Sequence, residues 1–372
     1  MTKIIHTTIS PCDNERRIFN EALTASHNGY RVEILALKIP GLPEISLLEN
    51  IVIRRLSVRR WQGGPLKFLS FNWKLFRRLL KSDFKILHSH DLWVLPASAC
   101  AAFLKKLRLI YDAHEFYRGL EIFKHKPFSG KIWKLAETLF IRQADAVITI
   151  NSFHKDLFRD AYRTIAQPEV LMNFPLQKEN LSLQNSSGFS ARNRTVLFQG
   201  IFKEGRGLPQ LIDAIRLLNS TDLELIGFGE LEKKLKKYVE QAGLQERVKF
   251  KGKVSWESLL NYTQKARAGL VLFEPNSVNY KYASPNKFFE YVMAGTPVIA
   301  SDIPTFRQFI SEFEVGILVD PNNSREIQEA IGELSENKEL WERLHKNCLE
   351  ARKVWNWESQ EKKLLEIYER LE

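Results

Sequence analysis

The chain has 372 residues, enough for two domains of ordinary size, and its 44% hydrophobic and 27% charged residues are those of a soluble globular protein. Its three cysteines are odd in number and far apart, which argues against a disulfide framework and favours a reducing, cytoplasmic compartment. The net charge of +11 lies wholly in residues 1–172, which carry 27 Lys and Arg against 16 Asp and Glu, so an anionic partner is expected there.

Neither a targeting segment nor a membrane-spanning segment is expected. The opening MTKIIHTTIS leads directly into a strand-like stretch. The longest mostly apolar segment, LWVLPASACAAFL, is shorter than the roughly 20 residues that cross a bilayer. The closest histidines, His88 and His90, have no partners at ligand spacing. The sequence therefore predicts no metal and no cofactor.

Strand-like and helix-like segments alternate through the first half of the chain. Short runs rich in Val, Ile and Leu predict strands, and the stretches between them predict helices near 13–28, 65–81, from 92 onward and near 130–143. The predicted strands are KIIHTTIS, RVEILAL, IVIRRL, KILHSH, LRLIYDAH, ADAVITI and EVLMNF.

The second half repeats the alternation. Its predicted strands are RTVLFQG, LELIGFG, RVKFKG, AGLVLF, PVIAS and VGILVD. Strands that each lead into an amphipathic helix imply parallel sheets covered on both faces. We therefore predict two doubly wound, Rossmann-like α/β domains, with ligands at the carboxyl ends of the strands.

A polar stretch separates the two halves. LQKENLSLQNSSGFSARNR, residues 176–194, is rich in Ser, Asn and Gln and shows no clear periodicity, which predicts an exposed linker. It divides an N-terminal domain, 1–175, from a C-terminal domain, 195–356.

The segment SPNKFFEYVMAGTPVIASDIP, residues 284–304, reads as a short helix, a Gly-Pro break and a buried strand. Ser284 is predicted to cap the helix and Pro285 to occupy its first turn. Asn286 and Glu290 share a face, and Lys287 and Glu290 are neighbours at a spacing of three. The helix start thus offers N–H groups, a positive dipole end and an ammonium to an anion such as phosphate, with a carboxylate suited to a diol. An ordinary capped helix with a surface Lys–Glu pair is the alternative.

This segment resembles the signature of nucleotide-sugar-dependent glycosyltransferases of the GT-B fold, in particular glycosyltransferase family 4. Other segments are similar to that family in the same order: HSHDLWVLPA, IYDAHEFY, ADAVITIN, VLMNFP, LFQGIFKEGRGLPQLIDAI, LELIGFGE and VKFKGKV. WNWESQEKKLLEIYERL resembles the family's last helix, which returns to the N-terminal domain, so residues from about 357 to 372 are expected to complete it. The resemblance implies two domains facing each other across a cleft, the first for the acceptor and the second for the donor.

The resemblance implies a donor site with two cations and one acid. Glu290 is similar to the glutamate that accepts hydrogen bonds from the ribose hydroxyls, and Lys287 would meet the diphosphate beside Asn286. Arg206 stands where the family usually has a lysine before a glycine, here Gly207. Its guanidinium would stabilise the charge on the leaving nucleoside diphosphate, which makes a metal unnecessary. A solvated surface lysine or arginine is the alternative for each cation.

The resemblance also assigns backbone contacts. Gly227 and Gly229 in GFG would let the backbone approach the ligand, although a lone Gly-x-Gly is common in turns. Lys253 and Val254 would bracket the base, mostly through their backbone.

Two positions depart from the family pattern. Ile201 stands where an arginine often follows a glycine, and Tyr282 stands where many members have an acid eight positions before the ribose-binding glutamate. One phosphate contact and one contact to the donor sugar are therefore expected to be missing or to come from other residues.

His114, in YDAHEF, closes a predicted strand and resembles the family's histidine near the donor sugar. Asp112 and Glu115 flank it, and polar groups at a strand's carboxyl end make a site candidate; capping of the next helix is the alternative. If the reaction retains anomeric configuration, as the resemblance implies, the leaving phosphate takes the acceptor proton and His114 positions the sugar. If it inverts, Asp13, Asp112 or Glu115 would be the base.

Basic and apolar residues interleave in 54–81, and 122–135 has a similar character. A basic amphipathic helix can lie at the interface of an anionic membrane. A core-packed helix with a solvated basic face is the alternative. The sequence thus predicts peripheral association with the inner face of the cytoplasmic membrane. The apolar residues at roughly helical spacing are Leu66, Leu69, Phe76, Leu79 and Leu80.

Together these features favour a glycosyltransferase that moves a sugar from a nucleotide-diphosphate sugar to a glycan or lipid-linked acceptor, in cell-surface polysaccharide or glycolipid biosynthesis. An epimerase of the same fold, acting on the nucleotide sugar itself, would need no basic acceptor face. A nucleic-acid-binding protein is a third reading, prompted by the basic half and eight tryptophans. It lacks a helix-turn-helix, zinc or aromatic RNA-binding motif, so no nucleic-acid partner is expected.

Overall fold

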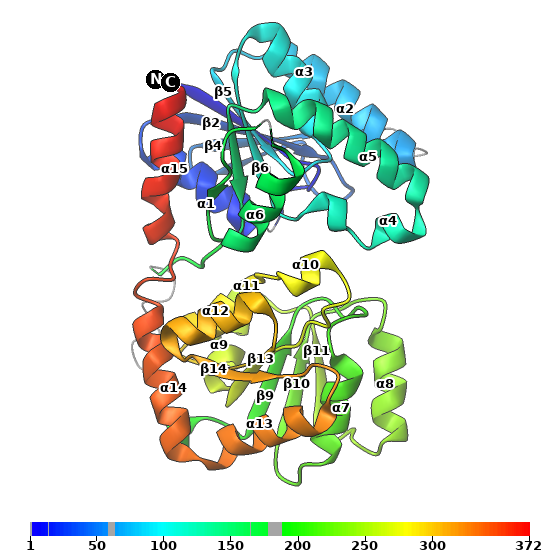
Figure 1. Cartoon of the computed structure of the whole chain (residues 1–372), viewed down its shortest axis with the longest axis vertical. Helices are drawn as coiled ribbons and strands as arrows, with labels where there is room; N and C mark the ends of the chain where they lie inside the picture. The colour runs from blue at the N-terminus through cyan, green and yellow to red at the C-terminus, as the bar shows by residue number, and fades with distance from the viewer. Residues whose placement is uncertain (1, 14, 59–63, 164, 178–187) are drawn as a thin grey trace. The chain divides into compact units, whose positions relative to one another are not determined.

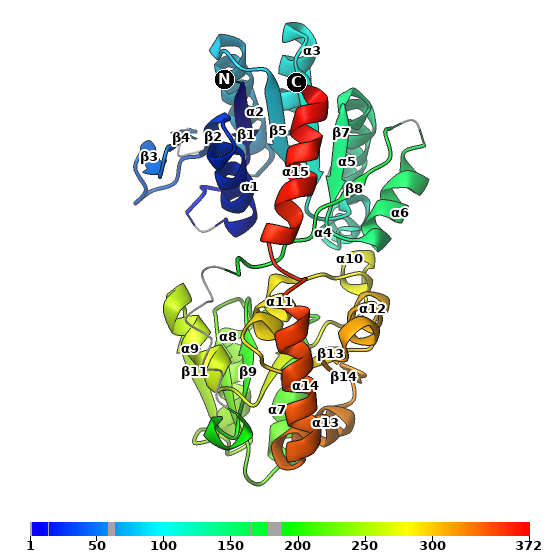
Figure 2. The same ribbon diagram turned by 90° about the vertical axis from the view of Figure 1, so that its left-hand side faces the viewer.

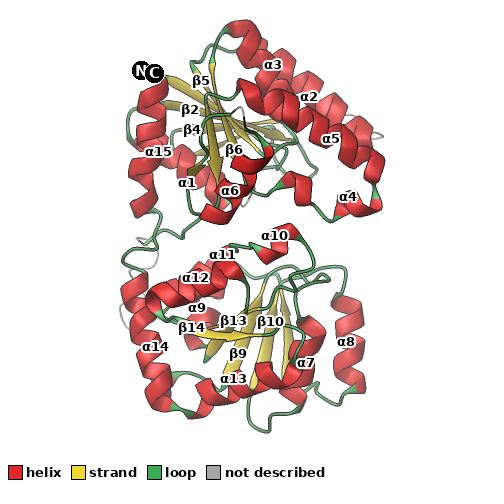
Figure 3. Cartoon of the chain, in the orientation of Figure 1, coloured by secondary structure: helices red, strands yellow, loops and turns green. Residues whose placement is uncertain are grey.

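The structure is a computed structural model, and it describes residues 2–13, 15–58, 64–163, 165–177 and 188–372. The chain forms two compact units. The N-terminal unit consists of Met1–Asn173 and Gln360–Glu372, and the C-terminal unit consists of Phe174–Ser359. Strands alternate with helices in each unit (Figures 1 and 3), which confirms the predicted doubly wound α/β fold.

The N-terminal unit is built on an eight-stranded sheet in the order β3-β4-β2-β1-β5-β6-β7-β8. Among the described residues of this unit, only the edge pairing of β3 with β4 is antiparallel. The order reverses between β1 and β5, where doubly wound sheets place their ligands. The strands are β1 (Lys3–Thr7), β2 (Arg31–Leu37), β3 (Ile45–Leu48), β4 (Ile51–Leu56), β5 (Ile86–His90), β6 (Arg108–Ala113), β7 (Ala146–Thr149) and β8 (Glu169–Val170).

Helices cover both faces of this sheet. Helices α1 and α15 lie on one face, and α2, α3 and α5 lie on the other (Figures 1 and 2). Because alternate strand residues point to opposite faces, Ile5 and Leu87 join the core with α2 and α3, whereas His6 and His88 lie under α1 and α15. The helices are α1 (Arg16–His27), α2 (Gly64–Lys81), α3 (Leu95–Lys105), α4 (Ile122–His125), α5 (Pro127–Phe140), α6 (Ser152–Ala161) and α15 (Glu358–Leu371).

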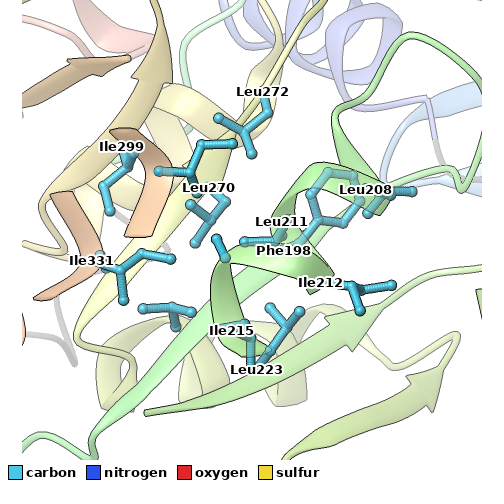
Figure 4. Close-up of a cluster of buried hydrophobic side chains, with 14 of the residues drawn as sticks. Phe198, Leu208, Leu211, Ile212, Ile215, Leu223, Leu270, Leu272, Ile299 and Ile331 are labelled. Atoms are coloured by element: carbon cyan, nitrogen blue, oxygen red, sulfur yellow. The ribbon is translucent and has the colours of Figure 1, made fainter. Parts of the chain in front are cut away.

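The C-terminal unit has a six-stranded parallel sheet in the order β11-β10-β9-β12-β13-β14, which reverses between β9 and β12. Its core packs α7, α8 and α13 against β9, β10 and β12. Figure 4 shows side chains of α7, α13 and the strands in this cluster. Burial of each large apolar side chain contributes about 1.5–3 kcal/mol, so this cluster fixes the strand ends that carry the site. The strands are β9 (Thr195–Gln199), β10 (Asp222–Ile226), β11 (Val248–Gly252), β12 (Ala268–Val271), β13 (Val298–Ser301) and β14 (Gly316–Val319).

The helices of this unit follow its strands along the chain. They are α7 (Leu208–Arg216), α8 (Glu232–Gln241), α9 (Trp256–Lys265), α10 (Val278–Lys281), α11 (Asn286–Met293), α12 (Pro304–Phe313), α13 (Ser324–Glu336) and α14 (Lys338–Ala351). The prediction that Ser284 caps α11 is wrong. Pro285 occupies the N-cap position in an extended conformation, and no side chain caps this helix.

The predicted linker 176–194 differs from the structure at its C-terminal end. Residues 189–191 form a short helical turn, and the buried Arg192 is anchored in the C-terminal unit. Its guanidinium donates to the carbonyl oxygen of Gly295 at 3.1 Å and to Thr296 Oγ1 at 2.6 Å. These bonds make residues 189–194 part of the C-terminal unit. Residues 178–187 of the predicted linker lie outside the described residues.

Candidate functional site

Two cations come together at the carboxyl end of the C-terminal sheet. Lys287 lies in the first turn of α11, and Arg206 lies in the loop between β9 and α7. Lys287 Nζ is 3.8 Å from the centre of the Phe198 ring, and Arg206 Cζ is 4.1 Å from the centre of the Phe273 ring. Lys287 Nζ is also 5.8 Å from the Phe273 ring. Aromatic faces therefore hold both charges close to the switch point between β9 and β12.

The surroundings of Lys287 disfavour its charged form. Burial and the neighbouring Arg206 lower the pKa of Lys287 well below the usual lysine range, and Glu290 acts in the opposite direction. A Cβ atom added to Gly200 would lie only 3.7 Å from Nζ, so the ammonium stands next to the end of β9. An anion bound here would stabilise the protonated lysine and raise its pKa.

Glu290 lies one turn further along α11 and is held by Gln199, the last residue of β9. Gln199 Nε2 donates to Glu290 Oε2, and Gln199 Oε1 accepts from Thr263 Oγ1 at 3.3 Å. Gln199 is buried, whereas Glu290 is half-buried. The buried amide of Gln199 therefore orients the carboxylate of Glu290, which lies next to the two cations.

Gly227 and Gly229 of GFG are needed for close packing of two loops, a role that the sequence did not predict. Gly227 and Gly229 have φ of 139° and 159°. A Cβ atom at Gly227 would lie 1.9 Å from the Gly200 carbonyl oxygen, and one at Gly229 would lie 2.3 Å from that of Phe202. The loops after β9 and β10 are thus in backbone contact, which only glycine permits. Gly207, with φ of 60°, starts α7 against Leu272.

The remaining predicted donor residues lie at neighbouring strand and helix ends. Asn286 is the exposed first residue of α11. Lys253 is exposed and Val254 half-buried, directly after β11. The carbonyl oxygen of Gly252 accepts from Gly227 N at 2.9 Å, which places the end of β11 beside the β10 loop.

In the N-terminal unit, Asp112 ends up in a buried ion pair. Arg17 Nε and Nη2 donate to its two oxygens at 2.8 and 2.7 Å, and Arg17 Nη1 donates to the carbonyl oxygen of Leu171 at 2.8 Å. Although burial opposes it, the charge of Arg17 holds the pKa of Asp112 well below its usual range. Asp112 is therefore unsuited to act as a general base, and it does not cap the next helix.

His114 follows β6 and lies between two acids. Its Nε2 is 3.0 Å from Asp112 Oδ2, and its Nδ1 is 3.5 Å from Asp91 Oδ1. Burial disfavours the charged ring, but Asp91 and Asp112 raise the pKa of His114 to about 9. The ring is therefore an imidazolium at neutral pH, with 23% of the side chain exposed. Glu115 is exposed beside it.

Several neighbours of these residues were not predicted. Asp91 follows β5 directly, at the strand end adjacent to that of β6, and accepts a hydrogen bond from Tyr117. The strand pattern could have indicated Asp91, because neighbouring parallel strands end at the same sheet edge. Arg17 and Gln199 carry no such signal, since each acts through a partner that is distant in the sequence.

His88 and His90 have no partners at ligand spacing in the sequence, but the fold brings two further residues to them. His6 from β1 and Glu21 from α1 lie beside them, and one donor atom from each of the four residues lies within 4.8 Å of the others. No local spacing could reveal this group, because its members come from three separate elements.

Helices α2 and α5 each carry exposed apolar side chains, which together are here called the α2/α5 surface. The helices touch through the Phe68 and Trp133 rings, whose centres are 5.7 Å apart. Phe71, Leu75 and Leu79 of α2 are buried. Large exposed apolar patches mark interaction sites. The exposed apolar members are Leu66, Leu69, Trp73, Leu80, Phe128, Ile132, Leu135 and Leu139, interspersed with exposed Lys74, Arg77 and Lys131.

The predicted apolar stripe of α2 is thus split between two faces. Leu79 packs in the core and Phe76 is half-buried, but Leu69 is 67% exposed and Leu66 and Leu80 also point outward. Phe71 and Leu75, which the stripe omits, complete the buried face. Across the described part of the chain, no helix combines the length and apolar character needed to span a membrane.

Comparison with known proteins finds glycosyltransferases for both halves of the chain. Residues 15–173 match Glycosyltransferase Family 4, and residues 181–351 match glycosyl transferases group 1. The chain is 26% identical to a phosphatidyl-myo-inositol mannosyltransferase of Mycobacterium leprae, covering 92% of this chain and 88% of that protein. It is 29% identical to O-antigen chain mannosyltransferase C of Escherichia coli, covering 74% and 73%.

Solved structures share the fold at lower identity. Sucrose-phosphate synthase from Thermosynechococcus elongatus superposes with a TM-score of 0.77 at 18% identity, covering 100% of this chain and 99% of that chain. HepE from Anabaena in complex with UDP-glucose superposes with a TM-score of 0.76 at 16% identity, covering 100% of both chains.

Proposed function

The chain belongs to glycosyltransferase family 4 and has the GT-B fold, and we propose that it transfers a sugar from a nucleoside-diphosphate sugar to a saccharide or lipid-linked acceptor. The observation that carries the donor assignment is the pairing of Lys287 with Arg206. Burial and the charge of Arg206 disfavour the Lys287 ammonium more than Glu290 favours it, and a diphosphate would add negative charge beside both cations. The complex of HepE with UDP-glucose gives a precedent for this ligand class on the same fold.

Glu290 would accept hydrogen bonds from the two ribose hydroxyls. A carboxylate has acceptor capacity for both, and Gln199 fixes its orientation. Asn286, Lys253 and Val254 would complete the site around the diphosphate and the base. Gly227 and Gly229 would hold the two loops close enough to present their backbone groups.

The proposed chemistry retains anomeric configuration and uses no metal for donor activation. Arg206 and Lys287 would stabilise the charge that develops on the leaving diphosphate, whose oxygen would accept the acceptor proton. Inversion would need a protein base, and the low pKa of Asp112 removes one of the three candidates for it. His114 would donate hydrogen bonds to the donor sugar and position it.

The acceptor is proposed to reside at, or be linked to, a membrane. Two relatives are named as mannosyltransferases, one for phosphatidyl-myo-inositol and one for the O-antigen chain. The α2/α5 surface combines exposed aromatic and aliphatic side chains with lysines and an arginine, which is the composition of an interfacial membrane contact. We propose peripheral attachment to an anionic cytoplasmic membrane through this surface.

A donor screen tests the core of this proposal. A nucleotide sugar present at a hundred times its Kd should stabilise the folded protein by about 2.7 kcal/mol, seen as a rise in Tm. Arg206→Ala and Glu290→Gln should each lower kcat by about 10²–10³, because each removes a contact to the reacting donor. Arg216→Ala, at an exposed arginine of α7, is the matched control and should keep wild-type rates.

Two outcomes would overturn the assignment. Wild-type turnover in both Arg206→Ala and Glu290→Gln would place the donor elsewhere. Conversion of a nucleotide sugar without any acceptor would instead indicate an epimerase, which has no use for the α2/α5 surface.

A further inference from the structure

Three histidines and one glutamate converge between the N-terminal sheet and α1. His6 on β1 is paired in register with His88 on β5, and His90 follows two residues later on the same face. Glu21 reaches them from α1, which covers this face. All four side chains have no solvent exposure.

Their ligand atoms lie at distances that suit a single bound cation. Glu21 Oε2 is 3.5 Å from His88 Nε2 and 3.8 Å from His90 Nε2, and His6 Nδ1 is 2.9 Å from His90 Nε2. A tetrahedral ion with bonds of about 2.0–2.1 Å separates its ligands by about 3.3 Å. Small side-chain adjustments would therefore bring the four atoms around one ion.

His6 and His90 share one hydrogen bond at the centre of this group, but three other central atoms make none. Among the described residues, neither oxygen of Glu21 accepts a hydrogen bond, and His88 Nε2 makes none either. Arg17 Nε is 3.1 Å from Glu21 Oε1, so this oxygen has an ion-pair contact. Each unsatisfied buried group costs about 1–3 kcal/mol, so an occupant that binds all of them would be strongly stabilised.

The outer atoms of the same residues are satisfied. His90 Nδ1 is 3.2 Å from Asp112 Oδ2, and His88 Nδ1 is 2.8 Å from the Tyr368 hydroxyl of α15. A metal-bound histidine characteristically donates its second N–H to a carboxylate or another oxygen, which leaves the first nitrogen for the metal. The rings of His88 and His90 also stack with centres 4.5 Å apart, an arrangement that suits neutral rings.

We propose that His6, Glu21, His88 and His90 form a buried binding site for a divalent transition metal, with Zn²⁺ as the best fit. Imidazole nitrogens with one carboxylate suit zinc and its first-row neighbours, whereas Mg²⁺ and Ca²⁺ require oxygen ligands. The ion would join α1 to β1 and β5, and it would reach α15 through Tyr368. This structural role goes beyond the proposed function and involves no donor residue.

A proton is the competing occupant. Glu21 as a neutral carboxylic acid could remain buried without a metal, and the whole group would then be a polar network only. Metal binding and protonation are mutually exclusive at this carboxyl group, so direct metal analysis distinguishes them.

The experiment uses the full chain, freed of metal with a chelator, incubated with Zn²⁺ and passed over a desalting column. We expect about one zinc per chain, a rise in Tm on loading, and a Co²⁺ derivative with the visible absorption of a tetrahedral site. Glu21→Gln and His88→Gln should lose the bound ion. Tyr368→Phe should weaken zinc binding by about 10–100-fold, as removal of an outer-shell partner does.

His27→Gln is the control, because His27 is an exposed histidine at the end of α1 whose Nε2 is 2.8 Å from Glu49 Oε2. It should keep the full zinc content, and far-UV circular dichroism should show that all variants are folded. If a variant does not fold, the Tm rise and the Co²⁺ spectrum of the wild-type chain still show whether the site binds a metal. Less than a tenth of an equivalent in the wild type, or zinc retained by both Glu21→Gln and His88→Gln, would overturn the site. Donor binding, measured in parallel, is independent of either result.

Discussion

Replacing Glu137 by glutamine should remove a pH-dependent loss of stability from the N-terminal unit. Glu137 is a fully buried acid of α5 that accepts hydrogen bonds from Tyr111, at 2.9 Å, and from Tyr162. Burial disfavours the carboxylate more than these bonds favour it, so the pKa of Glu137 is raised from 4.5 to about 7. The residue thus anchors α5, and with it half of the α2/α5 surface, through a group that titrates near neutral pH.

The sign follows from proton linkage. Between about pH 4.5 and 7 the folded protein keeps a proton that the unfolded chain has released. The stability that this group provides is therefore fully present below pH 4.5 and is lost as the pH rises through 7. Integration from about pH 5 to 8 gives a loss of roughly 2.5 kcal/mol. Glutamine has a similar volume and does not titrate. Between about pH 5 and 8, the free energy of unfolding of Glu137→Gln should therefore rise by that amount relative to that of the wild type.

The assay is urea unfolding of both proteins at pH 5, 6, 7 and 8, with hydrogen exchange of the α5 amides as a local reporter. In thermal unfolding, the relative gain of Glu137→Gln should be about 5–10 °C between the end points. Glu121→Gln, at an exposed acid, is the control and should follow the wild-type profile. A difference between Glu137→Gln and wild type that stays constant with pH would refute the argument.

Three further predictions concern the donor site and the α2/α5 surface. At pH values below the usual lysine range, binding of a nucleoside diphosphate should take up a proton at Lys287, whose pKa is lowered by burial and by Arg206, and this is seen as buffer-dependent heats in calorimetry. Lys287→Arg should abolish the uptake, and its persistence there would exclude Lys287. Gly227→Ala should destabilise the C-terminal unit by several kcal/mol in denaturant unfolding, because its Cβ would lie 1.9 Å from the Gly200 carbonyl oxygen; a loss below about 1 kcal/mol would contradict that contact. Anionic vesicles should bind the protein at low salt and release it at high salt, and Leu69→Asp with Trp73→Asp should weaken binding; unchanged binding would discard this surface.

The sequence predicted most of the fold because local patterns determine it. Apolar runs such as RTVLFQG and PVIAS could only be buried parallel strands, and β9 and β13 lie there. Helix α2 was expected near 65–81 and spans Gly64–Lys81, but its buried face was assigned wrongly. Basic residues fill both sides of that helix, so periodicity alone could not choose between Leu69 and Phe71.

The convergence of Lys287, Glu290 and Arg206 was predictable because they occupy one short signature and the loop after one strand, and their role in donor binding stays a prediction. Lys287, Glu290 and Arg206 meet in the structure at the same sheet edge. Their partners were not predictable. Gln199 looks like the polar end of a strand, and only the fold shows that it holds Glu290. The same reason hid the pairing of Arg17 with Asp112, whose members are 95 residues apart.

Buried charge is neutralised by an ion pair in the N-terminal unit but faces a like charge in the C-terminal unit, and this difference leads to a last prediction. In the N-terminal unit, Arg17 neutralises Asp112 within the fold, whereas in the C-terminal unit Lys287 and Arg206 disfavour each other. The donor's diphosphate gains a negative charge when the sugar leaves, so the cations should bind the product nucleotide more tightly than the nucleotide sugar. That preference lowers the barrier to transfer, but it also slows release of the product. We therefore expect the nucleoside diphosphate to be a strong competitive inhibitor whose advantage over the donor shrinks in Arg206→Ala. Equal affinity for donor and product in the wild-type enzyme would mean that the two cations do not sense the charge that the reaction creates.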